Sequence, residues 1–190
     1  MLRRGGAMGN QALRARLGRL TQASFCFTLV EGLAASEVLV RFGATPAPEG
    51  DGLLGEEPLV GVTRAWGWAV ALELESRLGA DPAVLCTLSL GTRAVSVHRV
   101  LDSHVHLSLA EDGVLVTSLT TIPPRTRQGA DPDRLLPVLR EVGLAEHPGG
   151  RTTVEGGEIG RVLEAVRRAF GVSFSARLWE GPFTIGELPW

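Results

Sequence analysis

Three of the four histidines in this 190-residue sequence lie within one short stretch, at His98, His104 and His106. Imidazole nitrogens bind zinc and related metals, and they also accept and donate protons near neutral pH. The cluster therefore predicts either a three-histidine metal site or an acid/base site in an enzyme. The alternative is that the three side chains form the polar face of a β-sheet.

The aliphatic residues around the histidines decide which face of the predicted hairpin the imidazoles occupy. A three-residue turn at 101–103 places Val97 opposite Leu107, so that aliphatic side chains from both strands share one face. His98 then lies directly across from His106 on the other face. Facing side chains on adjacent strands have Cβ atoms about 4.5–5.5 Å apart, which is compatible with shared metal ligation.

The next hairpin is expected to turn through three residues, Glu111, Asp112 and Gly113, with glycine in the left-handed position. This register places Leu109 beside Leu115 on the same aliphatic face. The opposite face holds serines and valines as well as the histidines. No carboxylate on these strands is placed to orient an imidazole, as metal-bound histidines usually require. We therefore favour the polar-face interpretation over the metal site, and we predict no cofactor.

Two tryptophans and two glutamates share the segment from Trp66 to Glu75, whose alternation predicts a strand. Trp66 and Trp68 point to one side, where they either line a ligand pocket or pack in the core. The other side has small residues, which let a helix or a ligand approach closely. Glu73 and Glu75 also lie there, either as an acid/base pair or as the solvated end of the strand.

Two arginines, Arg125 and Arg127, precede an expected helix start at Asp131. Basic side chains and the free amides of a helix N-terminus together form a binding site for an anion. Asp131 and Asp133 already supply negative charge at that end of the helix. Ion pairs between the arginines and these aspartates are therefore the favoured alternative.

No sequence motif of a known catalytic type accompanies these residues. The chain contains no G-x-S-x-G, no H-E-x-x-H, no phosphate-binding loop and no G-x-G-x-x-G after a strand. Cys26 and Cys86 lie among apolar residues without metal-type spacing, so we expect buried reduced thiols. These observations disfavour an enzyme.

Charge is distributed unevenly along the chain. All 19 basic residues are arginine; five of them precede residue 31, where no acidic residue occurs, and the other 14 share the rest of the chain with all 21 acidic residues. We expect a basic N-terminal arm or helix at 1–22 and an acidic body, which would repel the phosphate backbone of a nucleic acid. No transmembrane span and no secretory signal is recognisable, so a cytoplasmic location is expected.

Hydrophobic periodicity predicts a single α+β domain over residues 23–190. We expect a mostly antiparallel sheet of about six strands, with the helices packed on one side. The elements with the clearest pattern are a strand at 24–31 and helices at 36–42 and 158–170.

Several helix ends are marked by residues that satisfy free backbone groups. Ser36 is expected to cap the helix at 36–42, and Gly43 suits the left-handed residue after its end. Two further helices are expected to begin at Asp81 and Asp131, each within the sequence Gly-Ala-Asp-Pro, because aspartate accepts from exposed amides and proline fits the first helical position.

Three segments together resemble a family of actinobacterial proteins. They are 24–43 (SFCFTLVEGLAASEVLVRFG), 88–97 with 110–113, and 129–143 (GADPDRLLPVLREVG). Their order and spacing are similar to those of the domain-of-unknown-function family 6461, typical of Streptomyces, over about residues 24–185. The resemblance implies a cytoplasmic protein with no established activity, so there are no catalytic residues to transfer.

The preferred hypothesis is a non-catalytic binding or interaction module for a protein partner or a small ligand. One alternative is an enzyme that uses the histidine cluster, either metal-bound or in acid/base chemistry. A further alternative is an immunity or conflict-system protein. The candidate ligand-binding residues are Trp66, Trp68, Arg125 and Arg127, and the candidate metal ligands are His98, His104 and His106.

Overall fold

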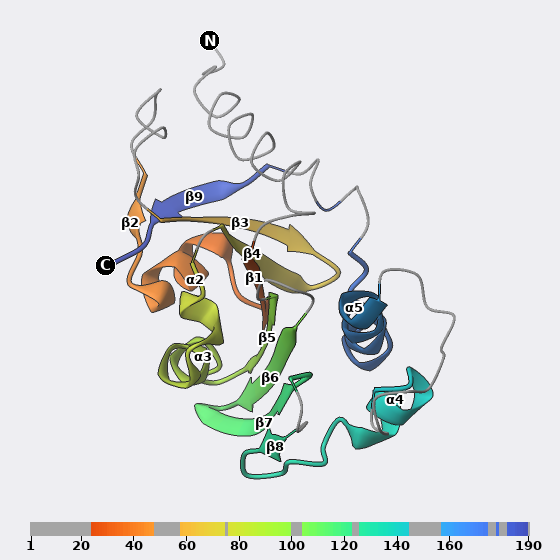
Figure 1. Ribbon diagram of the computed structural model, residues 1–190. Coiled ribbons are helices and arrows are strands. Elements are labelled where there is room, and N and C mark those ends of the chain that lie inside the picture. Colours follow the sequence, from red (N-terminus) through yellow and green to blue (C-terminus); the bar gives the residue numbers. More distant parts are fainter. Residues whose placement is uncertain are drawn as a thin grey trace.

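The computed structural model describes residues 24–47, 58–74, 76–99, 104–122, 126–144, 157–174, 178 and 182–189. In this part of the chain a single antiparallel sheet of nine strands organises the fold, in the order β2-β9-β3-β4-β1-β5-β6-β7-β8 (Figure 1). The α+β class and the antiparallel sheet confirm the prediction. The predicted arm at 1–22 lies outside the described residues.

Six long strands form the centre of the sheet, and three short strands extend it at the edges. The expectation of about six strands was too low because segments of two to four residues are too short to show alternation. The long strands are β1 (Phe25–Glu31), β3 (Leu59–Ala65), β4 (Trp68–Leu74), β5 (Arg93–Arg99), β6 (Val105–Glu111) and β7 (Val114–Thr120). The short strands are β2 (Thr45–Pro46), β8 (Arg127–Gln128) and β9 (Thr184–Glu187).

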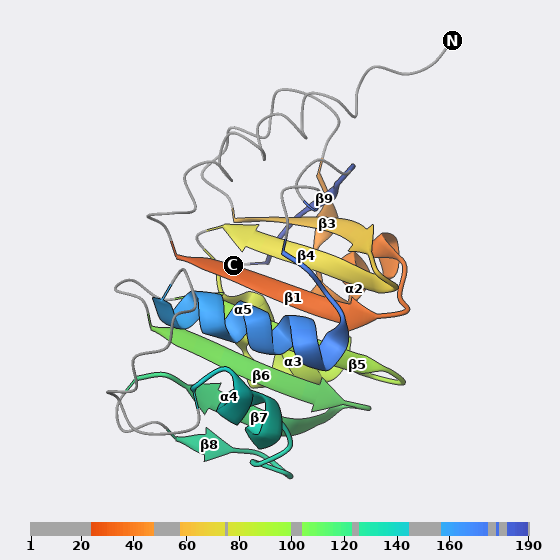
Figure 2. The same ribbon diagram turned by 90° about the vertical axis from the view of Figure 1, so that its right-hand side faces the viewer.

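Helices cover both faces of the sheet, which corrects the expectation of one covered side. On one face, here the α3 face, lie α2 (Ala35–Phe42), the 3-10 helix η2 (Leu78–Ala80) and α3 (Pro82–Leu88). On the other, the α5 face, lie α4 (Leu136–Glu141) and α5 (Gly157–Phe170), as Figure 2 shows. Helices on both faces are hard to predict from sequence, because a strand face with small side chains can either be exposed to solvent or pack closely against a helix.

Alternation along the strands gives each face its own core. On the α5 face, large side chains such as Leu107 pack in one cluster with Val166 of α5. On the α3 face, the strands contribute mostly small side chains, which leave room for Leu39 of α2 and Leu85 of α3. The small residues of that cluster are Ala69, Ala71, Ala94 and Ala110.

The hairpin of β5 and β6 has the register predicted from its aliphatic residues. Val97 pairs with Leu107, and both side chains are buried on the α5 face. His98 pairs with His106, so both imidazoles lie on the α3 face. A shift of one residue would have exchanged the two faces, and the cost of exposing the aliphatic residues prevents it.

The hairpin of β6 and β7 differs from the prediction. Its turn contains two residues, Asp112 and Gly113, both with positive φ (47° and 79°), as a type I′ turn requires. A bulge at Val116 then restores the alternation, so that Leu109 pairs with Thr117 rather than lying beside Leu115.

The ends of α2 and α3 largely follow the prediction. Asp81 caps α3 by accepting a hydrogen bond from the Ala83 amide at 2.8 Å. Gly43 follows α2 with φ of 70° in the left-handed region. The N-cap of α2 is Ala34 rather than Ser36, and no side chain caps that end.

The helix expected after Asp131 begins only at Leu136. Pro137 then lies in the first turn, where its missing N–H is not needed; deeper in a helix it would break a hydrogen bond and clash with the preceding turn. α5 agrees closely with the expected bounds, and Glu164 forms an ion pair with Arg168, one turn further along the helix, at 2.7 Å. None of the described helices has the length and apolar character needed to cross a bilayer.

Candidate functional site

A row of polar side chains crosses the α3 face of the sheet. The register places Glu73 of β4 beside Cys26 of β1. Cys26 in turn lies beside His98 of β5, and His98 lies beside His106 of β6. The next row, two residues along each strand, consists of the hydroxyl side chains of Thr28, Ser96, Ser108 and Ser118.

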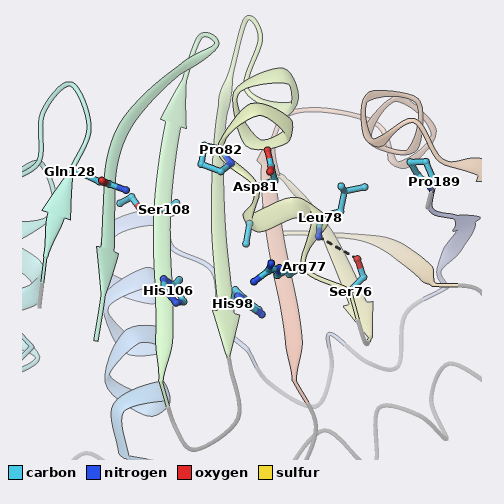
Figure 3. A pocket seen from close by; sticks show the side chains of 12 residues that line it. Ser76, Arg77, Leu78, Asp81, Pro82, His98, His106, Ser108, Gln128 and Pro189 are labelled. Atoms are coloured by element: carbon cyan, nitrogen blue, oxygen red, sulfur yellow. Dashed lines mark hydrogen bonds between the residues drawn. The ribbon is translucent and has the colours of Figure 1, made fainter. Parts of the chain in front are cut away.

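A cleft of about 560 Å³ lies over the histidine end of this row (Figure 3). This volume is within the range of roughly 300–1,000 Å³ that is usual for small-molecule sites. Arg77 and Asp81, from the segment around η2 and the start of α3, form one wall, and Gln128 of β8 lies on the opposite side. His98 and His106 form part of the floor.

The two imidazoles at the cleft are stacked, with ring centroids 5.9 Å apart and planes inclined by 21°. Burial lowers the pKa of both His98 and His106, and the charge of the nearby Arg77 guanidinium lowers both further. Both rings are therefore neutral near pH 7, each with one N–H donor and one acceptor nitrogen. Nε2 of His98 lies 3.4 Å from Ser24 Oγ. His106 has no hydrogen-bond partner among the described residues.

His104 is the third histidine of the predicted metal site. Within the described ranges, no group of three His, Cys, Asp or Glu side chains is placed to hold a metal ion. His104 precedes β6, and its buried Nδ1 has no hydrogen-bond partner in the same ranges. The described geometry thus gives no support to the predicted three-histidine centre and instead presents a pair of imidazoles to the cleft.

Glu73 is fully buried, although the sequence suggested an acid/base pair or a solvated strand end. Its Oε1 accepts a hydrogen bond from the Gly79 amide at 2.9 Å, and its Oε2 accepts one from Ser76 Oγ at 2.8 Å. Burial raises the pKa of this carboxyl, and the hydrogen bonds partly oppose that rise. Through these contacts Glu73 holds the segment that brings Arg77 to the cleft.

The same segment approaches the sheet too closely for any side chain at Gly79. A Cβ at this position would lie 2.1 Å from Thr28 Oγ1 and 2.6 Å from Glu73 Oε1. The glycine is therefore required by space and not by backbone conformation. The position of the cleft wall depends on this close approach.

Both cysteines are free, as the sequence suggested. Cys26 is fully buried and its Sγ lies 3.4 Å from Ser96 Oγ. Burial and the neighbouring Glu73 raise the pKa of this thiol. Because the thiolate is the reactive form, Cys26 is a poor nucleophile. Cys86, on α3, is only half-buried.

Arg77 is the site residue that sequence reasoning missed. Its side chain is exposed at the cleft, and no described carboxylate lies within ion-pair distance of its guanidinium. Several other arginines have such partners; Arg93, for example, pairs with Glu31 at 2.7 Å. The one available signal was indirect, since Arg77 lies between the buried Glu73 and the cap of α3.

The two predicted tryptophans do not line the cleft. Trp66 lies in the β3–β4 turn with φ of 53° and is 46% exposed, so the strand begins at Trp68 and not at Trp66. Trp68 is buried on the α5 face, where it meets Phe170 edge-on at 5.8 Å. This is the core-packing alternative.

The predicted arginines also lie elsewhere. Arg127 forms an ion pair with Asp133 at 2.9 Å, which is the favoured alternative from the sequence. Its strand neighbour Gln128 is the residue that lines the cleft. Arg125, like Glu75, lies outside the described residues.

Comparison with known proteins adds a family and no further relative. Residues 53–189 match the model of a family of unknown function, DUF6461. The matched range includes the cleft residues from Arg77 to Gln128. No curated protein and no solved structure matches the chain.

Proposed function

The chain belongs to the family of unknown function DUF6461, and from the geometry of its α3 face we propose that it is a binding module that holds a small polar ligand in the cleft. The main observation in support is a set of polar groups that meet at the cleft and have no hydrogen-bond or ion-pair partner in the described part of the chain. Arg77 and His106 both belong to this set. A ligand would provide the hydrogen bonds that these groups lack.

The chemistry of the cleft favours binding over catalysis. Ser108 Oγ and Ser118 Oγ are 2.9 Å apart and hydrogen-bond to each other, so neither hydroxyl is paired with an imidazole as a serine nucleophile would be. Nor is either imidazole at the cleft hydrogen-bonded to a described carboxylate that would orient it. The groups present can recognise a ligand, and they lack the arrangement that activates one.

The proposal is tested by native mass spectrometry of untagged protein isolated from the cells that produce it. We expect one additional small mass per chain, which is lost on denaturation. The variant Gln128→Trp, at an exposed position beside the cleft, should lose this mass because the indole fills the cavity. The control Thr45→Trp places the same side chain on the far edge strand and should retain it.

Three results would contradict the proposal. One is repeated recovery of the bare chain; another is retention of the additional mass in Gln128→Trp. A third is turnover of the bound compound, which would identify the histidine pair as part of an enzyme instead.

A further inference from the structure

We infer that the ligand of this cleft is an anionic, hydroxyl-bearing small molecule, whose anionic group is held by Arg77 together with His98 and His106. The inference depends on the proposed function, since it assigns a chemical class to the occupant of the same cleft. It follows from the charges at the two ends of the cleft and from their protein partners.

Among the described residues, Arg77 is the charged side chain that lines the histidine end of the cleft. The two imidazoles face that guanidinium closely enough for its charge to depress their protonation. His104, just before β6, is a further neighbour of His106. Cys26, beside His98 in the adjacent strand, is a buried and protonated thiol.

Two acidic side chains close to Arg77 in the sequence are already hydrogen-bonded to the protein. Asp81 Oδ1 accepts from the amides of Ala83 and Val84 at 2.8 and 3.3 Å. Glu73 is fully buried and accepts from Gly79 and Ser76. Neither carboxylate is within ion-pair distance of Arg77. Arg77 therefore has no ion-pair partner in the described part of the chain, and the lining carboxylate Asp81 is hydrogen-bonded at the N-terminus of α3.

An anion supplies the ion-pair partner that Arg77 lacks, with suitable geometry. The guanidinium of arginine donates two parallel hydrogen bonds to a carboxylate or a phosphate, and such charge-assisted bonds are the stronger kind. A neutral imidazole donates a further hydrogen bond from its N–H. Arg77, His98 and His106 lie on the same part of the cleft, as Figure 3 shows, so one anionic group can meet all three.

The other end of the cleft is lined by hydrogen-bonding side chains. Ser108, Ser118 and Gln128 line it, and their hydroxyl and amide groups both donate and accept. These groups match the hydroxyls of a ligand rather than an apolar body or a second charge. The volume of about 560 Å³ also exceeds the space that a lone phosphate or carboxylate needs.

The inference is tested by titration calorimetry with five probes: glucose 6-phosphate, gluconate, inorganic phosphate, neutral glucose and cationic glucosamine. We expect glucose 6-phosphate or gluconate to bind more tightly than inorganic phosphate and glucose, and glucosamine to bind least. Comparison of the first two distinguishes a phosphate from a carboxylate as the preferred anion. Higher salt concentration should weaken the binding of both.

Two matched variants locate the anion. Arg77→Gln should weaken the binding of the preferred anionic probe about tenfold or more, because it removes a charge-assisted hydrogen bond. Arg140→Gln, at an exposed arginine of α4 on the opposite face of the sheet, should leave it unchanged. Both positions are exposed, so neither change should prevent folding.

The inference is overturned if glucose or glucosamine binds as tightly as the anionic probes, if Arg77→Gln binds them as tightly as the wild type, or if none of the five probes binds. In the first two cases the cleft remains a ligand site and the proposed function stands. In the third case, the proposed function also fails only if the native protein is recovered without a bound small molecule.

Discussion

The two faces of the sheet are built from the same strands but differ in the polarity of their side chains. On the α5 face, side chains such as Leu107 and Val97 are buried in an apolar cluster under α4 and α5. On the α3 face, the residues next to them in sequence, such as His98 and Ser108, belong to polar rows that the helices cover only in part. The strand alternation thus gives the α5 face a large apolar cluster, and it leaves polar rows beside the apolar cluster of the α3 face, where we propose that a ligand binds.

The largest effect is expected from a change that breaks the α5 face. Leu107→Ala removes a side chain that is 1% exposed within the apolar cluster, so it should lower the free energy of unfolding by about 2–5 kcal/mol. The variant Ser108→Ala, at the next residue in the sequence, loses one hydrogen bond to Ser118. It should lower the free energy of unfolding by about 0.5–1.5 kcal/mol. Urea denaturation of both variants measures the difference. Equal losses would remove the distinction between the faces.

A change at the wall of the cleft should have an intermediate effect on stability and a large one on ligand binding. Gly79→Ala places a Cβ 2.1 Å from Thr28 Oγ1, so the segment must move away from the sheet. Overpacking of this kind costs about 1–3 kcal/mol. We expect urea denaturation to show that loss and native mass spectrometry to show loss of the bound mass.

The double variant Gly79→Ala with Thr28→Ala is the control for this steric argument. Removal of Thr28 Oγ1 relieves the closer of the two clashes, while that with Glu73 Oε1 remains. Part of the lost stability should therefore return. No recovery in the double variant would show that the wall is not held by close packing.

The buried carboxyl of Glu73 should make stability depend on pH. Its pKa is raised in the folded protein, so the unfolded chain releases the proton first as the pH rises. The stabilising contribution of the protonated carboxyl is fully present below its unfolded-state pKa and is lost as the pH rises through the folded-state pKa. Glu73→Gln cannot ionise, and its amide can retain the hydrogen bond from Gly79.

Urea denaturation at about pH 4.5 and about pH 8 measures this effect. Relative to the wild type, Glu73→Gln should be more stable at the higher pH than at the lower one. A difference between the two proteins that is independent of pH would show that Glu73 has an ordinary pKa. The opposite trend would indicate that the ionised carboxylate is stabilised by its hydrogen bonds more than burial destabilises it.

The smallest effect is expected at the predicted site residue that lies away from the cleft. Arg127→Gln removes a surface ion pair with Asp133, and such pairs contribute about 0.2–1 kcal/mol. Thermal denaturation should detect little change, and the affinity for the anionic probe should be the same as in the wild type. A loss of affinity similar to that of Arg77→Gln would extend the site beyond the cleft.

The sequence predicted the aliphatic framework well because that framework depends on pairing alone. The match of Val97 with Leu107 determined the hairpin register, and with it the common face of His98 and His106. Pairing arguments are insufficient where a turn or a bulge changes the number of residues between paired positions. The bulge at Val116 compensates for the two-residue turn before it, and sequence alternation does not distinguish that combination from a three-residue turn.

The rest of the site could not be predicted because it depends on contacts between segments that sequence patterns do not connect. Glu73 is buried because the backbone of Gly79 turns back onto it, and Arg77 reaches the cleft as a result. The cover on the α3 face was missed for a related reason. Small residues such as Ala71 are compatible with either solvent or a closely packed helix.

The most direct test of the central claim is a nuclear magnetic resonance titration of the labelled chain with the tightest-binding probe, with backbone amides followed on both faces. We predict shifts at Arg77, His106 and Ser118, at the cleft, and none in α5. Shifts concentrated in α5 or spread over both faces would contradict the assignment of recognition to the α3 face.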